Sequence, residues 1–376
     1  MKRRTLLQHM VASSAALSLP SFAQSDRRIV IGQSAAFSGP AAQLGIQMNR
    51  GAKIYFDALN AAGGVNGNTI ELRTLDDGYE PDRCKANTER FITKESVFAL
   101  FGYVGTPTCL AALPVVNENK TVFFGPFTGA ESLRDPFSKN VFHIRASYFD
   151  ETALIVKQLT SLGLNKIAVF YQNDAYGKAG LDGVTRALKP SNLTPVATGT
   201  VERNTVNVAQ AVKDIVAAKP EAVVQISAYK SSAAFIREAR KAGYGGTFYN
   251  VSFVGTQALA DELGKEARGI MISQVMPSPF STTAPLSREY LEAVAKAGAD
   301  ATANYSSMEG YVAAKVFAEG LKRAGKNPSR ESFIAGMESI NNANLGGFNV
   351  AFGPHDHVAS RFVELSMLTE DGKVRR

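Results

Sequence analysis

Apolar and polar positions follow two periodicities along the chain, and their alternation predicts its architecture. In the first part, short apolar or β-branched runs resemble buried strands, and the segments between them repeat apolar residues every three or four positions, as helices do. The strand-like runs cover residues 28–34, 68–77, 97–103 and 121–127, and the helical patterns cover 43–63 and segments from Pro81 and Pro107. Strands that alternate with helices predict a parallel sheet with helices on both faces.

The same alternation restarts near residue 151 and predicts a second sheet. Its strand-like runs cover residues 166–172, 194–201, 222–227 and 246–252, and its helical patterns cover 151–163, 176–189, 205–218 and 230–242. We therefore expect an α/β fold with two Rossmann-like, doubly wound lobes.

The last part of the chain does not show this alternation of strands and helices. After an apolar run at 269–279, three helical patterns (284–297, 305–324 and 329–340) have no strands of their own, and the β-like tail "RFVELSMLTEDGKVRR" follows. We expect these helices to return to the first lobe and the tail to join the second. The predicted lobes are residues 24–145 plus 276–352 and residues 146–275 plus 353–376, with a hinge and a cleft between them.

The N-terminus predicts export. A basic head (Lys2, Arg3, Arg4) precedes a short apolar run that closes on the small-x-small site Ser21-Phe22-Ala23. This order is typical of a cleaved secretory signal peptide, residues 1–23, and indicates a periplasmic protein. The Arg3-Arg4 pair also fits a twin-arginine signal, so both export routes remain open.

Charge and composition exclude some classes of partner. The 376-residue chain has a net charge of +7, and removal of the signal leaves 38 basic and 34 acidic residues. Basic residues are scattered among acids and show no nucleic-acid-binding signature. Beyond the signal, no apolar stretch reaches the roughly 18 residues of a membrane span.

Four strand ends carry polar residues suited to ligand binding, because helix N-termini converge at that edge of an α/β sheet. They are "AAFSGPAAQLG" with Ser38, "GTPT" with Thr106 as the expected N-cap, "GPFTGAE" with Thr128 and Glu131 in a capping-box pattern, and "YQNDAYGKAG" with Asp174 as N-cap and Tyr176 at the rim. The hydroxyls and free amides at Thr106 and Thr128 could hold a ligand carboxylate. Alternatively, these threonines only cap helices.

Catalytic motifs are missing from the sequence. It contains no G-x-S-x-G, no Walker loop and no G-x-G-x-x-G after a strand. His355-Asp356-His357 follows Gly353-Pro354 and favours a turn over a metal site, and His143 fits the core or the cleft lining. We expect neither an enzyme nor a bound cofactor or metal.

Cys84 and Cys109 are the only cysteines. Export to an oxidising compartment makes a disulfide between them plausible. Two free, buried thiols are the alternative.

The order and spacing of several motifs resemble a known family. "SGPAAQLG", "GGVNGNTIEL", "DDGYEPDRCKANTERFI", "FGYVGTPT", "GPFTGA", "RASYFDET" and "YQNDAYGKAG" are similar to motifs of the periplasmic solute-binding proteins of ABC importers, of the branched-chain (hydrophobic) amino acid type. This resemblance implies two lobes joined by three crossover segments that close on a small carboxylate ligand. It also implies a monomer that delivers the ligand to a membrane permease, although the same fold could present it to a sensory receptor.

The resemblance places the ligand site on residues from both lobes. The implied ligand-binding residues are Leu44, Thr106, Phe127, Thr128, Tyr148, Tyr176, Tyr229 and Phe253. The first cysteine of the family's disulfide corresponds to Tyr79 in this chain, so a bridge between Cys84 and Cys109 would be shifted relative to the family.

One position departs from the family pattern. Amino-acid binders of this type grip the ammonium with an acid where this chain has Phe253, and the next acid in that loop is Asp261. An amino acid would need another counter-charge, such as Asp150 or Glu151, because an unpaired buried ammonium is costly. The sequence thus predicts a hydrophobic amino acid or, in better accord with Phe253, a related aliphatic or aromatic acid without the ammonium.

Overall fold

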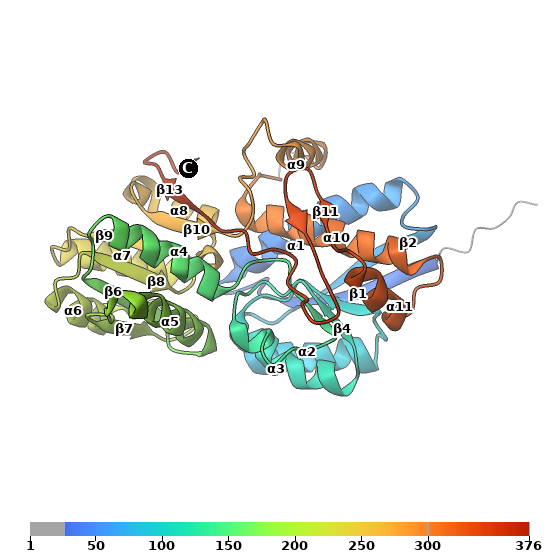
Figure 1. The fold of residues 1–376 in the computed structure, drawn as a ribbon, viewed down its shortest axis with the longest axis horizontal. Helices are drawn as coiled ribbons and strands as arrows, with labels where there is room; N and C mark the ends of the chain where they lie inside the picture. Colours follow the sequence, from blue (N-terminus) through green and yellow to red (C-terminus); the bar gives the residue numbers. More distant parts are fainter. Residues whose placement is uncertain (1–26, 299–300, 376) are drawn as a thin grey trace, which may run out of the picture.

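The structure is a computed structural model that describes residues 27–298 and 301–375. The predicted signal peptide, residues 1–23, lies outside the described residues. The described chain forms two α/β lobes side by side, the first on the right and the second on the left of Figure 1.

The first lobe is built on a parallel five-stranded sheet in the order β2-β1-β3-β4-β5. Its strands are β1 (Arg27–Ala35), β2 (Asn68–Asp76), β3 (Ala99–Phe101), β4 (Val122–Phe124) and β5 (Val141–Phe142). Its early helices are α1 (Ala42–Ala61), α2 (Pro81–Thr93), α3 (Thr106–Glu118) and the 3₁₀ turn η1 (Glu131–Leu133). Each strand-like run of the first part of the sequence forms a strand, and the buried runs of β3 and β4 lie in the middle of the sheet.

The second lobe contains a seven-stranded sheet in the order β14-β13-β10-β9-β8-β6-β7. Its strands are β6 (Ile167–Gln172), β7 (Thr198–Val201), β8 (Ala222–Ile226), β9 (Thr247–Asn250), β10 (Met271–Gln274), β13 (Glu364–Leu368) and β14 (Val374–Arg375). Its helices are α4 (Tyr148–Ser161), α5 (Ala175–Leu188), α6 (Ala209–Ala217), α7 (Tyr229–Lys241) and α8 (Thr256–Leu263), with short 3₁₀ turns η2 (Lys189–Ser191), η3 (Ser252–Val254) and η4 (Gly264–Ala267). The parallel strands β6 to β10 confirm the second doubly wound sheet.

The late helices lie with the first lobe. They are α9 (Pro285–Lys296), α10 (Tyr305–Ala324) and α11 (Arg330–Glu338), and the two-stranded β11 (Ala343–Asn344) and β12 (Asn349–Val350) follow them. Helix α10 packs along α1 so closely that a Cβ atom at Gly310 would overlap the carbonyl oxygen of Met48. Glycine is required there because the two backbones touch.

The chain returns to the second lobe at its end. Strand β13 pairs antiparallel with β10, and this pairing is visible as the red arrow in the left-hand lobe of Figure 1. The segment before it still lies beside the first sheet, since the His143 amide donates to the His357 carbonyl and the Ala359 amide donates to the His143 carbonyl, both at 2.8 Å. We therefore propose that the third crossover lies between Ala359 and Glu364 rather than at residue 353.

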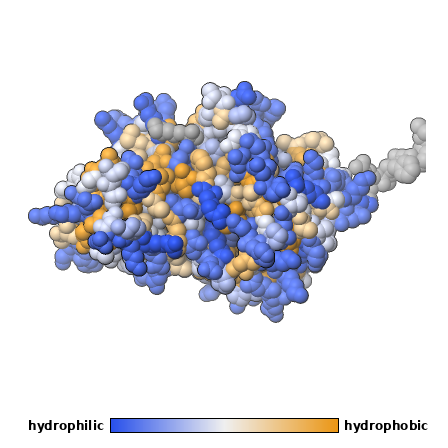
Figure 2. All heavy atoms as spheres, in the orientation of Figure 1, coloured by the Kyte–Doolittle hydropathy of each residue, from blue (hydrophilic) through white to orange (hydrophobic). Residues whose placement is uncertain are grey.

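The surface combines charged and apolar residues. Figure 2 shows hydrophilic residues over much of both lobes on this face, with an apolar area on the left-hand lobe toward the junction. Within residues 27–298 and 301–375, no helix has the length and apolar character needed to cross a membrane.

Candidate functional site

Two threonine hydroxyls meet where α3 and the loop after β4 face the second lobe. Thr106 is the first residue of α3, and Thr128 follows β4 in the neighbouring loop. Their Oγ1 atoms are 2.7 Å apart, and Thr128 Oγ1 donates to the Tyr148 hydroxyl at 3.4 Å in an alternative arrangement of its proton. All three side chains are buried. The adjacent strand ends therefore bring together hydroxyl groups that are far apart in the sequence.

Aromatic rings from both lobes close over these hydroxyls. We call Tyr79, Phe127, Tyr148, Tyr176 and Phe253 the interlobe aromatic cluster. The centroid of the Phe253 ring, in η3 of the second lobe, lies 4.7 Å from that of Tyr176, 5.7 Å from Phe127 and 6.0 Å from Tyr79. Tyr148 and Tyr176 are 5.4 Å apart. Phe127 and Tyr79 belong to the first lobe, so the cluster joins the two lobes through apolar contact.

The other two predicted site residues lie where α1 meets the second lobe. Leu44 is buried in the first turn of α1, and its Cδ2 atom would be 2.6 Å from a Cβ atom at Gly255. The Tyr229 hydroxyl, at the start of α7, accepts a hydrogen bond from the Gln43 amide at 3.4 Å. All eight predicted residues are thus buried, and seven of them have a contact that involves the opposite lobe or the threonine pair.

The threonines do not cap helices as the sequence predicted. Gly105, at φ 102°, is the N-cap of α3, and Thr106 is its first residue. The turn after Thr128 begins at Ala130 and has no capping box with Glu131, although Thr128 Oγ1 accepts the Ala130 amide at 3.2 Å. Glycine takes the cap position because only it adopts this positive φ without strain. The hydroxyls are consequently turned toward each other.

The cap predicted at α5 is confirmed. The Asp174 carboxylate accepts the amides of Tyr176 and Gly177. This anchors the first turn of α5, from which Tyr176 reaches the cluster. Within the described part of the chain, the buried Tyr176 hydroxyl has no hydrogen-bond partner. Burial raises the pKa of Tyr176 well above its usual value, so the hydroxyl keeps its proton and can donate it to a bound ligand.

The two acids considered as ammonium partners are already engaged. Asp150 accepts hydrogen bonds from the amide and hydroxyl of Ser147, both at 2.9 Å, and forms a capping box with Ser147, the N-cap of α4. Glu151 is fully buried and accepts the Ser252 amide at 2.7 Å, the Ser252 hydroxyl at 3.0 Å and the Ser273 hydroxyl at 2.5 Å. Burial raises the pKa of Glu151, while Arg145 opposes this shift. Both carboxylates therefore serve the protein's own hydrogen bonds.

Comparison with known proteins identifies the family. The family described as "Periplasmic binding protein" matches residues 28–373. This chain belongs to that family. "Leu/Ile/Val-binding protein homolog 7" of Brucella suis biovar 1 (strain 1330) is 28% identical over 84% of this chain and 82% of that protein.

Two solved structures of similar sequence share the whole fold of this periplasmic binding protein. A possible leucine/isoleucine/valine-binding protein from Rhodopirellula baltica SH 1 has a TM-score of 0.91 and 35% identity, and covers 94% of this chain and 97% of its own. A substrate-binding periplasmic protein from Ralstonia solanacearum has a TM-score of 0.87 and 34% identity, with 92% and 99% covered. The family consists of solute-binding proteins rather than enzymes.

Sequence reasoning missed Tyr79 as a member of the interlobe aromatic cluster of this periplasmic binding protein. Tyr79 follows β2 at a positive φ of 64°, and its hydroxyl accepts a hydrogen bond from Gln172 Nε2 of the second lobe at 3.3 Å. The available signal was its place in "DDGYEP", directly after a predicted strand. Arg145 was also missed: it is the first residue of the motif "RASYFDET", but nothing in that motif indicates its distant partner Glu309.

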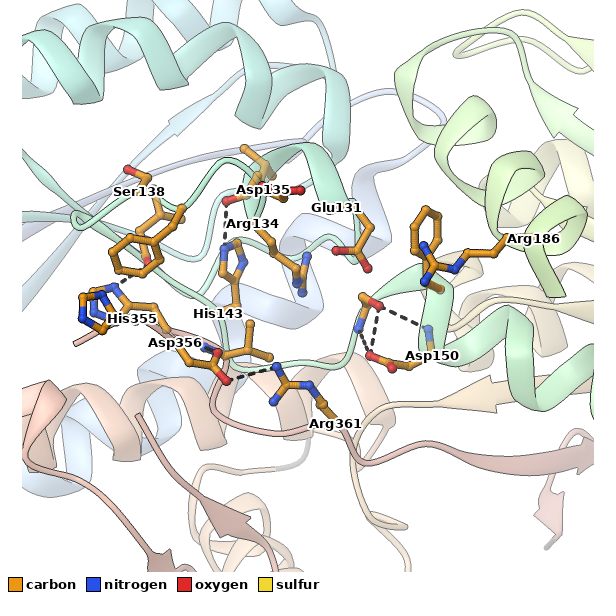
Figure 3. A pocket seen from close by; sticks show the side chains of 17 residues that line it. Glu131, Arg134, Asp135, Ser138, His143, Asp150, Arg186, His355, Asp356 and Arg361 are labelled. Carbon is orange, nitrogen blue, oxygen red and sulfur yellow. Dashed lines mark hydrogen bonds and ion pairs between the residues drawn. The ribbon is translucent and has the colours of Figure 1, made fainter. Parts of the chain in front are cut away.

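A cavity lies on the hinge side of this periplasmic binding protein. It has a volume of about 560 Å³, and Figure 3 shows that charged side chains of both signs line it, Glu131 and Arg134 from the first lobe and Arg186 from the second. The paired Asp356 and Arg361 and the buried His143 also line this cavity. Neither Thr106 nor Thr128 lines it, so it is separate from the threonine pair.

His355 and Asp356 lie in a turn, as the sequence favoured, and His357 follows it. Gly353 and Asp356 pair across it, and the His357 ring stacks on Phe142 with centroids 3.9 Å apart. Within residues 27–298 and 301–375, no three histidine, cysteine, aspartate or glutamate side chains are grouped to hold a metal.

The predicted disulfide is not formed in the structure. Cys84 and Cys109 are free thiols, fully buried in an apolar cluster with residues such as Leu100 and Tyr103. Burial raises the pKa of both thiols well above the usual value. They pack as small apolar side chains, which is the alternative the sequence left open.

Proposed function

We propose that this protein is the receptor of an ABC uptake system, which binds a small carboxylate ligand between its lobes and passes it to a membrane permease. The observation that carries the proposal is the pairing of the Thr106 and Thr128 hydroxyls under aromatic rings from both lobes. Relatives named for leucine, isoleucine and valine support a hydrophobic ligand. The receptor acts as a monomer and leaves the ligand chemically unchanged.

The proposed carboxylate site combines hydroxyls with a helix N-terminus. Cys109 makes the first amide hydrogen bond of α3, to Gly105, so the amides that precede it have no partner within the helix. Those amides, with the hydroxyls of Thr106 and Thr128, favour an anion at this point. The Tyr176 hydroxyl, which has no hydrogen-bond partner among residues 27–298 and 301–375, adds a donor from the second lobe. A carboxylate would therefore be contacted from both lobes, which favours closure.

The same surroundings favour a ligand without an ammonium group. Phe253 presents a ring where amino-acid binders present an acid, and Asp150 and Glu151 are held by serines. An ammonium buried here would have no free carboxylate beside it, at a cost of several kcal/mol. We propose an aliphatic or aromatic acid, such as a 2-keto acid or an aryl carboxylate.

Binding shifts the protein from open to closed arrangements. The rings of Phe127 and Phe253 contact each other only while the lobes are together. A ligand that touches both lobes stabilises this state in proportion to its difference in affinity for the two arrangements. The permease would then recognise the closed form.

A thermal-shift screen tests the proposed ligand class. Residues 24–376 are mixed with leucine, phenylalanine, their 2-keto acids and benzoate, and hits are confirmed by calorimetry. We expect the melting temperature to rise with the acids that lack ammonium, because a ligand at 100 times its Kd stabilises by about 2.7 kcal/mol. Tight binding of leucine or phenylalanine together with no binding of the deaminated acids would refute the preference.

Removal of one hydroxyl tests the threonine pair. Thr106→Val should weaken binding of the best acid roughly tenfold or more, because a hydrogen bond to a charged group contributes about 1.5 to 3 kcal/mol. Thr106→Ser keeps the hydroxyl and serves as the control, with affinity near that of the wild type. Equal affinity of both variants, measured by calorimetry, would place the carboxylate elsewhere.

Introduction of a carboxylate at position 253 tests whether Phe253 determines the preference for ligands without an ammonium group. Phe253→Glu should lower the affinity for a 2-keto acid and raise that for the matching amino acid, since the new carboxylate can pair with an ammonium. Phe253→Leu removes the ring without adding charge, so the ratio of the two affinities should stay near that of the wild type. If Phe253→Glu leaves the ratio of the two affinities unchanged, this residue does not face the ligand's α-substituent.

A further inference from the structure

A buried arginine connects the hinge to both walls of the ligand site. Arg145 lies in the first crossover, between β5 and α4, and is 1% exposed. Its Nε and Nη2 atoms donate to the two carboxylate oxygens of Glu309 on α10, both at 2.7 Å. Its guanidinium carbon lies 4.2 Å from the centroid of the Phe127 ring. On the side of the first lobe, Arg145 is therefore held by a bidentate ion pair and supports Phe127 from behind.

The remaining Nη1 atom of Arg145 reaches the second lobe. It donates to the Ser252 hydroxyl at 3.2 Å. That hydroxyl donates in turn to Glu151 Oε1 at 3.0 Å, and the Ser252 amide donates to Glu151 Oε2 at 2.7 Å. Since a hydroxyl can accept one bond while it donates another, the chain Arg145–Ser252–Glu151 is consistent. Of the contacts of Arg145 described above, only the one to Ser252 leaves the first lobe.

Ser252 directly precedes Phe253, whose ring packs against Phe127. Arg145 thus contacts the ring of Phe127 in the first lobe and Ser252, the residue before Phe253, in the second lobe. We propose that Arg145, acting through Ser252, is a positioning residue that holds Phe127 and Phe253 in the closed arrangement and thereby slows ligand release. The inference rests on the proposed function, in which the ligand lies beside these rings.

The cost of breaking this link is confined to one hydrogen bond. When the lobes separate, Arg145 keeps Glu309 and Phe127, and Glu151 keeps the Ser252 amide and Ser273. No buried charge is left alone, so the link can open and close reversibly. Removal of Arg145 itself would strand Glu309 in the interior, so the informative substitution is at Ser252.

Ser252→Ala and Ser273→Ala form a matched pair for the test. Each removes one hydroxyl from Glu151, but only Ser252→Ala deprives Arg145 of its contact with the second lobe. Stopped-flow binding of the acid that stabilises the wild type gives the association and dissociation rates. We expect Ser252→Ala to raise the dissociation rate about five- to tenfold with the association rate unchanged, because a less stable closed state releases its ligand sooner. Ser273→Ala should lower the melting temperature and leave the dissociation rate within about twofold.

Small-angle X-ray scattering of the ligand-free proteins supplies a second readout that needs no ligand. We expect a larger mean radius of gyration for Ser252→Ala than for the wild type or Ser273→Ala, since the link favours closure. Equal dissociation rates for the two variants, or equal radii for all three proteins, would overturn the inference. Failure of every acid to bind the wild type would instead refute the proposed function, while the scattering would still test the link.

Discussion

Local hydrogen bonds hold single residues near the proposed ligand site, and Asp77 provides one such case. Its carboxylate is fully buried behind Tyr79, where it accepts the Ser34 hydroxyl at 2.7 Å and the Tyr79 amide at 2.8 Å. The second of these bonds stabilises Tyr79 at its positive φ. Burial is the main cause that raises the pKa of Asp77 to about 6, although the hydrogen bonds oppose the shift.

This shift predicts how Asp77 affects stability. The folded protein binds the proton more tightly than the unfolded chain, whose aspartate pKa is about 3.9, so the contribution of Asp77 to the free energy of unfolding grows as the pH falls from about 6 to about 4. As the pH falls from 7 to 4, the free energy of unfolding of the wild type, measured in urea, should rise by about 2 to 3 kcal/mol relative to that of Asp77→Asn. The exposed Asp82→Asn is the control and should show no such gain. A pH-independent difference for Asp77→Asn would show that its carboxyl titrates normally.

At the scale of single residues, only part of the candidate site could be predicted from the sequence. Residues at strand ends, such as Thr106, Thr128 and Tyr176, could be located because the carboxyl edge of a parallel sheet is where ligands bind. Their hydrogen bonds could not be predicted, because Gly105, at its positive φ, takes the expected cap position and the Thr106 hydroxyl pairs with that of Thr128 instead. Arg145 and Glu309 are 164 positions apart, and no local pattern could pair them.

Helices and strands follow their periodic patterns closely. Helix α10 spans Tyr305–Ala324, the same residues as its apolar repeat, while β3 spans only Ala99–Phe101 of the expected 97–103. A long amphipathic repeat constrains both ends of a helix, but the pairing of a short strand depends on neighbours elsewhere in the chain. What the pattern does not reveal is how close two helices come.

The contact between α1 and α10 predicts a large effect of one methyl group. A Cβ atom at Gly310 would overlap the Met48 carbonyl oxygen, and one at Gly51 would overlap that of Ser307. Gly310→Ala should therefore lower the free energy of unfolding by at least about 2 kcal/mol, despite the better helix propensity of alanine. Gly245→Ala adds the same methyl group in open space and should change stability by less than about 0.5 kcal/mol. Similar urea midpoints for the two variants would mean that the helices can move apart freely.

Across the whole molecule, polar contacts add to the apolar contact between the lobes. Arg203 of the second lobe lies 2.9 Å from Glu80 of the first, and Asn204 donates to Glu80 at 2.7 Å and to the Gly78 carbonyl at 3.0 Å. Arg203 and Glu80 are partly exposed, so their pair contributes at most about 1 kcal/mol and is screened by salt. The alternation of strand and helix patterns in the sequence predicted two lobes. These contacts could not be predicted, because they depend on how the lobes pack against each other.

Salt therefore tests the contribution of Arg203 to closure. Arg203→Gln should weaken ligand binding about two- to fivefold at 20 mM NaCl, and this difference should shrink at 500 mM NaCl as screening removes the pair from the wild type. Arg90→Gln breaks an exposed pair with Glu95 inside the first lobe and should leave affinity unchanged. A loss of affinity for Arg203→Gln that persists at high salt, in calorimetric titrations, would point to a cause other than charge.

The antiparallel pairing of β13 with β10 constrains the order of folding during synthesis. One edge of β10 has its partner strand β13 in residues 364–368, which emerge from the ribosome only after the described helices of the first lobe. The first lobe needs segments made after the second lobe has begun, and the second lobe still lacks β13 when the last helix of the first lobe has been made. A nascent chain therefore exposes an open sheet edge, which can mispair with other chains, until residues 364–368 appear.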